Sequence, residues 1–99
     1  MRTKFEIPII EIAQACQKHK IRELALFGSA LREDFKPSSD VDLLVTFEPD
    51  AQIGFLAFSK IQREFAGLFH RPVDLVSKNG LNPRIRQAVL ADARVIYAA

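Results

Sequence analysis

Three short segments with the character of β-strands constrain the fold of this chain more than any other feature of its sequence. They are residues 21–27, 41–47 and 72–77. The first is apolar-rich and stops at Gly28-Ser29, which favours a buried strand that runs into a tight turn. In the second, Val41, Leu43 and Val45 alternate with the residues between them, and this two-residue period is typical of a strand. We therefore predict that a sheet forms the centre of the molecule.

Segments with helical periodicity separate these strands. We expect a first helix that begins near Pro8 and is closed by the cations Lys18 and Lys20. A short helix over residues 30–34, a long helix over 55–68 and a last helix over 83–91 follow. The loops are residues 35–39, 48–54 and 78–82, and residues 95–97 either add an edge strand or only pack. This order predicts an α/β (α+β) fold with a small mixed sheet covered by helices.

Apolar residues at helical spacing define the faces that we expect to pack on the sheet. In the first helix they are Ile9, Ile12, Ala13 and Cys16, and in the long helix they are Phe55, Phe58, Ile61, Phe65 and Leu68. Because Cys16 lies on such a stripe, we expect a buried, structural thiol rather than a catalytic one.

The size and composition of the chain restrict its class. With 99 residues it supports one modest core, so we predict a single domain over residues 1–99. One cysteine cannot form an internal disulfide, and we expect a cytoplasmic protein. No apolar run approaches the roughly 18 residues that span a bilayer, so we expect no membrane association. The formal net charge of +2 is too small to indicate nucleic-acid binding, and any phosphate recognition must come from a local site.

Two aspartates at the start of the second strand carry the first chemical signal. Asp40 and Asp42 project from one face of that strand, where two carboxylates repel each other unless a positive charge lies between them. Mg²⁺ prefers carboxylate oxygens and completes its shell with water and substrate phosphates. The alternative interpretation is a pair of solvated turn residues.

The turn at Gly28-Ser29 carries the second signal. Glycine lets a ligand approach the backbone, and the free N–H groups at a helix start favour an anion. We expect this turn to lie beside the strand that carries both aspartates, so that a phosphate site and a metal site become neighbours. A plain turn with a helix cap is the alternative.

These residues resemble the signature of the minimal nucleotidyltransferases (MNT) of the DNA polymerase beta superfamily, which is Gly-Ser, a spacer, and Asp-x-Asp followed by an apolar strand. Here the signature is Gly28-Ser29 and Asp40-Val41-Asp42. Arg32, Asp34 and Ser39 match residues that the subfamily tends to carry before the first aspartate. Asp74 stands where the family has a third carboxylate, and it shares the strand parity of the first two.

The resemblance implies transfer of a nucleoside monophosphate from a nucleoside triphosphate to an acceptor hydroxyl. In that case Asp40, Asp42 and Asp74 are the catalytic residues and hold two Mg²⁺ ions, and Asp74 lies near the attacking hydroxyl. Gly28, Ser29, Arg32 and Ser39 bind the nucleotide. Arg32 either contacts phosphate or pairs with Asp34.

The resemblance also implies a partner. Many short members of the family are antitoxins of HEPN-domain ribonuclease toxins, in type VII toxin-antitoxin pairs, and transfer AMP from ATP to a tyrosine of the toxin. Two alternatives remain open: an antitoxin that acts by binding only, and a transferase for a small molecule. A homo-oligomer is also possible. Lys78, Arg84, Arg86 and Arg94 either form a solvated helix face or help to bind the nucleotide or a partner.

Overall fold

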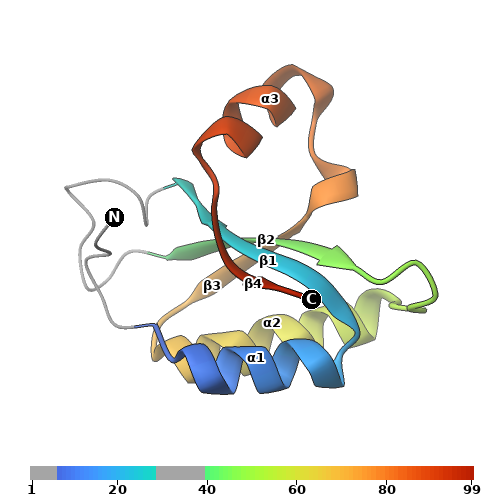
Figure 1. The fold of residues 1–99 in the computed structure, drawn as a ribbon, viewed down its shortest axis with the longest axis vertical. Helices are drawn as coiled ribbons and strands as arrows, with labels where there is room; N and C mark the ends of the chain where they lie inside the picture. The colour runs from blue at the N-terminus through green and yellow to red at the C-terminus, as the bar shows by residue number, and fades with distance from the viewer. Residues whose placement is uncertain (1–6, 29–39) are drawn as a thin grey trace.

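The computed structural model describes residues 7–28 and 40–99. In these ranges the chain forms three α-helices, one 3₁₀ helix and four strands (Figure 1). The elements in chain order are α1 (Ile9–Lys18), β1 (Ile21–Phe27), β2 (Val41–Phe47), α2 (Phe55–Phe69), β3 (Val73–Ser77), η2 (Lys78–Gly80), α3 (Pro83–Asp92) and β4 (Arg94–Ala98).

The four described strands form one sheet in the order β3-β2-β1-β4. Strands β2 and β3 are parallel, as expected for two strands joined through a helix, here α2. Strand β1 is antiparallel to both of its neighbours, β2 and β4. The prediction of a mixed sheet with helices against it is confirmed, and residues 94–98 resolve the open alternative in favour of an edge strand.

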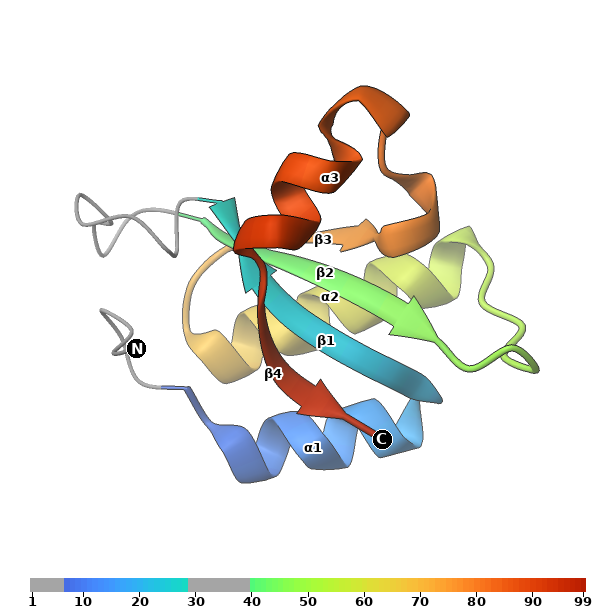
Figure 2. The ribbon, with the colours of Figure 1, turned by 45° about the horizontal axis from the view of Figure 1, so that its top comes forward.

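The two faces of the sheet are covered unequally. Helices α1 and α2 lie side by side under one face, whereas α3 stands on the other (Figures 1 and 2). The main core lies between the sheet and the helix pair. Its buried residues are Ile12, Ala15, Cys16, Ile21, Leu24, Leu26, Val41, Leu43, Val45, Ile61, Phe65, Phe69, Val73 and Leu75. A second, smaller cluster joins Ala25, Leu44 and Leu81 to half-buried residues of α3.

The helix periodicity predicted the buried stripes correctly except in the first turns. Burial begins at Ile12 in α1 and at Ile61 in α2. Ile9 is 52% exposed and Phe55 is 81% exposed, so the expectation that both pack on the sheet is wrong. A helix of 15 residues is about 22 Å long. The five residues of β3 span about 17 Å, so the first turn of α2 has less sheet to cover.

Two smaller differences concern the connections. The segment predicted as a loop after β3 begins with the 3₁₀ helix η2, which places Leu81 in the smaller cluster. The predicted short helix over residues 30–34 lies outside the described residues. Among the described residues, no helix is long and apolar enough to cross a membrane.

An ion-pair cluster joins the end of α1 to α2. Glu64 accepts a hydrogen bond from Lys18 Nζ, whose closest carboxylate oxygen is 3.0 Å away, and its Oε1 lies 3.0 Å from Nε2 of His19. Partial burial raises the pKa of Glu64, but the hydrogen bonds and positive charges of His19 and Lys18 outweigh it and lower the pKa below the usual 4.5. The cluster therefore stabilises the contact between the two helices when Glu64 is ionised.

We expect the pH dependence of stability to reflect Glu64. A carboxyl group whose pKa is lowered by folding stabilises the protein above its usual pKa, and this contribution is lost as the pH falls through the lowered value. From neutral pH to below pH 4.5, wild type should therefore lose more free energy of unfolding than Glu64→Gln, measured by urea unfolding. Glu11→Gln, an exposed position on α1, should follow wild type. Parallel profiles for wild type and Glu64→Gln would contradict this assignment.

Candidate active site

Register and burial place two of the predicted carboxylates side by side. Val41, Leu43 and Val45 are buried in the core under α1 and α2, so the alternate positions of β2 face α3. In the parallel pair, Asp42 lies opposite Asp74, as Val41 lies opposite Val73. Directly paired residues on neighbouring strands are about 5 Å apart. Asp42 and Asp74, which are 32 positions apart in the chain, thus lie next to each other on the face of the sheet that carries α3.

This pairing is electrostatically unfavourable without a compensating cation. Like charges at directly opposite positions of a sheet destabilise it. Asp42 is half-buried and Asp74 is exposed. The two paired carboxylates therefore do not stabilise the sheet. They present oxygens of the kind that a divalent cation binds.

Asp40 lies at the same end of the sheet. It is exposed and directly precedes β2, two residues before Asp42. The next amide, that of Val41, donates a 2.9 Å hydrogen bond to the carbonyl oxygen of Pro72, which ties the beginning of β2 to the beginning of β3. All three predicted carboxylates therefore belong to one corner of the molecule.

The three side chains do not converge on a single point. Within residues 7–28 and 40–99, no group of three His, Cys, Asp or Glu side chains is arranged to hold a metal ion. In chemical type the donor set nevertheless fits Mg²⁺, which needs only one or two carboxylates because water and substrate phosphates supply the other oxygens. The geometry thus brings together the carboxylates of Asp42 and Asp74 as register partners and leaves Asp40 as their exposed neighbour.

Gly28 lies beside the candidate site, directly after the end of β1. Phe27 pairs with Asp42, so the turn that follows β1 lies against this carboxylate. Gly28 has a φ of +69°, and a Cβ atom added to it would collide with Oδ2 of Asp42 and lie 3.2 Å from its Cγ. Only glycine suits this position, because a side chain would both strain the backbone and displace the carboxylate. Gly28 itself is exposed.

The other predicted nucleotide-binding residues, Ser29, Arg32 and Ser39, lie outside the described residues.

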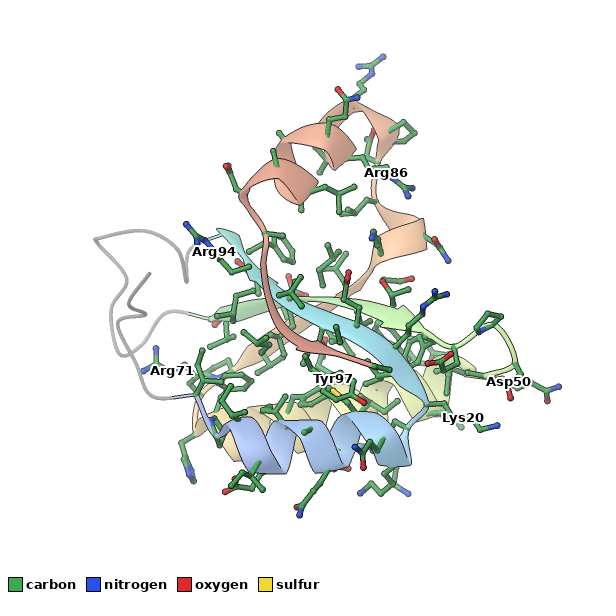
Figure 3. The ribbon with its side chains drawn as sticks, in the orientation of Figure 1. Lys20, Asp50, Arg71, Arg86, Arg94 and Tyr97 are labelled. Atoms are coloured by element: carbon green, nitrogen blue, oxygen red, sulfur yellow. The ribbon has the colours of Figure 1, made fainter. Side chains whose placement is uncertain are left out.

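The predicted site residues did not include Arg71, a half-buried cation three residues before Asp74 (Figure 3). The sequence could have indicated it, because Arg71 lies between the end of a long helix and the start of a strand that carries a carboxylate.

The described residues argue against a nucleophile at Cys16. The thiol is free and buried on α1, and desolvation raises its pKa to about 12. It is therefore neutral at physiological pH, and a neutral thiol is a poor nucleophile. The expectation that Cys16 is buried is confirmed.

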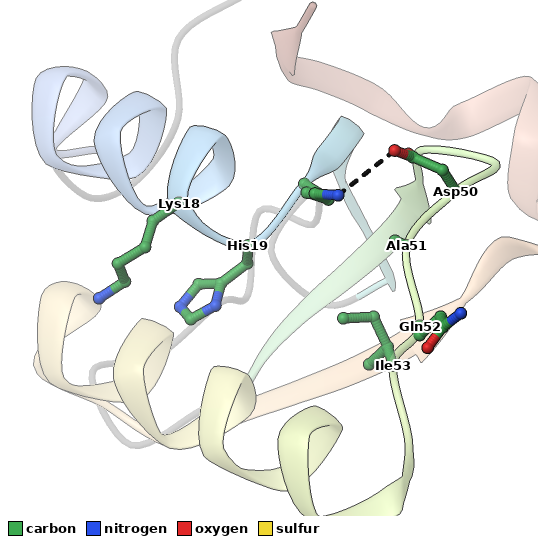
Figure 4. Close-up of a pocket in the computed structure, with 7 residues that line it drawn as sticks. Lys18, His19, Asp50, Ala51, Gln52 and Ile53 are labelled. Carbon is green, nitrogen blue, oxygen red and sulfur yellow. Dashed lines mark hydrogen bonds and ion pairs between the residues drawn. The ribbon is translucent and has the colours of Figure 1, made fainter.

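A hollow of about 480 Å³ lies at the opposite end of β1 from Gly28. Residues 18–20 line one side and residues 50–53 the other (Figure 4). Lys20 Nζ lies 3.3 Å from Oδ2 of Asp50, so the charges at its rim compensate each other. The hollow lacks paired carboxylates, and β1 separates it from Asp42 by about 20 Å.

The contact between Gly28 and Asp42 leads to a stability prediction. Gly28→Ala should lower the free energy of unfolding by about 1–3 kcal/mol, because alanine is strained at positive φ and its Cβ displaces the Asp42 carboxylate. Urea unfolding measures the change. Gly67→Ala is the matched control, since an added Cβ at this position in the last turn of α2 meets nothing within 4 Å. It should raise stability by up to about 1 kcal/mol, and an equal response of both variants would refute the assigned contact.

Comparisons with known proteins identify the family of the chain. A family model described as polymerase beta, nucleotidyltransferase, matches residues 10–99. The protein adenylyltransferase MntA of Thermococcus cleftensis is 36% identical over 81 residues, which cover 82% of this chain and 78% of that protein. A solved minimal nucleotidyltransferase superposes with a TM-score of 0.71 at 34% identity and covers 86% of this chain and 85% of its own.

A more distant structural neighbour shares the fold. It is a chain from the complex of a tri-AMPylated Shewanella oneidensis HEPN toxin with an MNT antitoxin, with a TM-score of 0.67 at 18% identity; the match covers 92% of this chain and 70% of that one. The fold match and the family match over residues 10–99 confirm the resemblance that the Gly-Ser and Asp-x-Asp residues suggested. The chain belongs to the polymerase beta family of nucleotidyltransferases, as a minimal nucleotidyltransferase.

Proposed function

We propose that this chain is a protein adenylyltransferase that transfers AMP from ATP to a tyrosine hydroxyl of a HEPN-domain toxin, and that it acts as the antitoxin of this partner. The name of its relative from Thermococcus cleftensis supports the choice of reaction. The AMPylated toxin in complex with an MNT antitoxin supports the choice of acceptor.

The pairing of Asp42 with Asp74, with Gly28 against Asp42, carries the proposal. Adjacent carboxylates destabilise a sheet in the absence of a cation. The exposed backbone of Gly28, whose positive φ favours glycine, lies beside Asp42. Together these features favour a site that accepts a metal-bound nucleotide.

In this proposal Asp40, Asp42 and Asp74 hold two Mg²⁺ ions. When bound, the metal ions neutralise charge on the attacking and leaving oxygens of an in-line displacement. The backbone at Gly28, with Ser29, Arg32 and Ser39, binds the nucleotide. Asp74 is assigned to the acceptor side because β3 forms the edge of the sheet, where a second substrate has access.

The proposed chemistry balances without a further reactant. The acceptor oxygen forms a bond to the α-phosphorus of ATP, and the bond from that phosphorus to the oxygen bridging to the β-phosphate breaks. Pyrophosphate leaves with the electron pair of that bond. The proton of the acceptor hydroxyl passes to the carboxylate of Asp74 and from there to water.

The proposed setting is the cytoplasm, and the proposed unit is a single domain over residues 1–99. The one cysteine of the chain is free and buried, so the fold needs no oxidising compartment. In this proposal the surface around the site recognises the acceptor.

The carboxylates can be tested by one substitution. Asp42→Asn should lower AMP transfer by at least about a hundredfold, because removing a carboxylate weakens charge neutralisation worth several kcal/mol in the transition state. The measurement is incorporation of label from α-phosphate-labelled ATP, with Mg²⁺, into proteins of a lysate of the source cells.

Asp50→Asn is the matched control. It makes the same chemical change at an exposed aspartate near the opposite end of β2, where it affects the ion pair with Lys20, and it should transfer like wild type. Transfer that persists in Asp42→Asn would contradict the proposal. If neither wild type nor Asp42→Asn transfers AMP and both still neutralise the toxin, the chain is an antitoxin that acts by binding only.

A further inference from the structure

Access to the candidate site is restricted to one face of the sheet. Helices α1 and α2 cover the opposite face (Figures 1 and 2). Asp42 and Asp74 alternate with the residues buried under these helices, so they project on the face where α3 stands. The smaller cluster attaches α3 to this face through Leu44 of β2, two residues beyond Asp42. A protein that delivers a hydroxyl to the two carboxylates therefore also comes against α3.

Helix α3 exposes more apolar surface than its packing explains. None of its residues is buried, and it contacts the sheet through half-buried Val89 and Leu90. Ile85, one turn before Val89, is 51% exposed, and Val95 at the start of β4 is 55% exposed. Large apolar residues that remain this exposed beside a site suit a protein interface.

The formal charge of the chain is concentrated in the same region. Residues 81–99 contain Arg84, Arg86 and Arg94 but only one acid, Asp92, and they account for the whole net charge of +2, since the remaining residues hold equal numbers of each sign. Among the described residues, none of these three arginines has an ion-pair partner, whereas Lys78 pairs with Glu23 at 3.6 Å. Figure 3 shows Arg86 beside α3 and Arg94 at the start of β4, where it pairs with Leu26 of β1.

We propose that this region docks an acidic surface of the protein that accepts AMP. We call it the α3 ridge, defined by Arg84, Ile85, Arg86, Arg94 and Val95. The inference rests on the proposed function, because it assigns the acceptor's docking surface to the same site. Unpaired cations around exposed apolar side chains complement a partner that presents carboxylates near its acceptor hydroxyl.

A protein partner fits the ridge better than RNA does. Ile85 and Val95 are aliphatic and cannot provide the aromatic stacking on which unpaired bases are bound. The only aromatic residue of residues 81–99, Tyr97, is half-buried in the main core. Three arginines around an aliphatic surface form a small interface with a basic rim rather than a track for a phosphate backbone.

Binding of a defined acidic peptide tests the ridge without ATP. The probe is a fluorescein-labelled peptide in which glutamates flank a tyrosine, and its affinity is measured by fluorescence anisotropy at low and high salt. Arg84→Gln/Arg94→Gln should weaken binding about three- to tenfold at low salt, since each exposed charge pair contributes a modest amount. High salt should reduce the difference.

Lys60→Gln/Arg63→Gln is the matched control, because it removes the same charge from exposed positions of α2 on the other side of the molecule. It should bind the peptide like wild type, and a peptide with glutamines in place of glutamates should bind to neither. Equal losses in the two double variants, no binding to wild type, or tighter ridge-dependent binding of a single-stranded RNA would each overturn the proposal.

The peptide-binding experiment can fail or succeed independently of the proposed AMP transfer. Peptide binding needs neither ATP nor metal, so Asp40→Asn/Asp42→Asn should bind the peptide like wild type even though it does not transfer AMP. In the transfer assay, the ridge variant should raise the KM for the protein acceptor and leave the KM for ATP unchanged. A change in both would assign the arginines to the nucleotide site and overturn the docking role.

Discussion

The parallel pairing of β2 with β3 is the constraint on which the candidate site depends. Its register places Val41, Leu43 and Val45 beside Val73 and Leu75 on the face that α1 and α2 cover. A slip of one residue would turn the buried side chains outward and the aspartates into the core, at a cost of several kcal/mol. Burial of the apolar residues therefore forces Asp42 and Asp74 into register on the other face. The hydrophobic core and the carboxylate pair are two consequences of one pairing.

The antiparallel pairing of β1 with β2 brings the turn at Gly28 to the candidate site. Because Phe27 pairs with Asp42, the chain leaves β1 at Gly28 directly against the carboxylate. A positive φ and the absence of a Cβ atom are both required there. The central strand β2 thus contacts a glycine turn on one side and a third carboxylate on the other. A metal-bound triphosphate needs this combination of anion-tolerant backbone and oxygen ligands.

The unequal covering of the sheet links this chemistry to recognition. One face is closed by α1 and α2, which the Glu64 cluster holds together. The other face carries the carboxylates and the lightly packed α3. The candidate site and α3 therefore share a face of the sheet. Residues 81–99, which include α3 and β4, carry the excess of positive charge.

The sequence by itself determined the local structure and the side on which each residue lies. The two-residue period predicted β2 and the common face of Asp40, Asp42 and Asp74, and helical spacing predicted α1, α2 and α3, because these periods act over neighbouring residues. Only the tertiary structure decided that Asp42 meets Asp74, that β4 pairs with β1, and that Ile9 and Phe55 remain exposed. These outcomes depend on strand pairing between distant segments and on the lengths of packed elements, which no local period encodes.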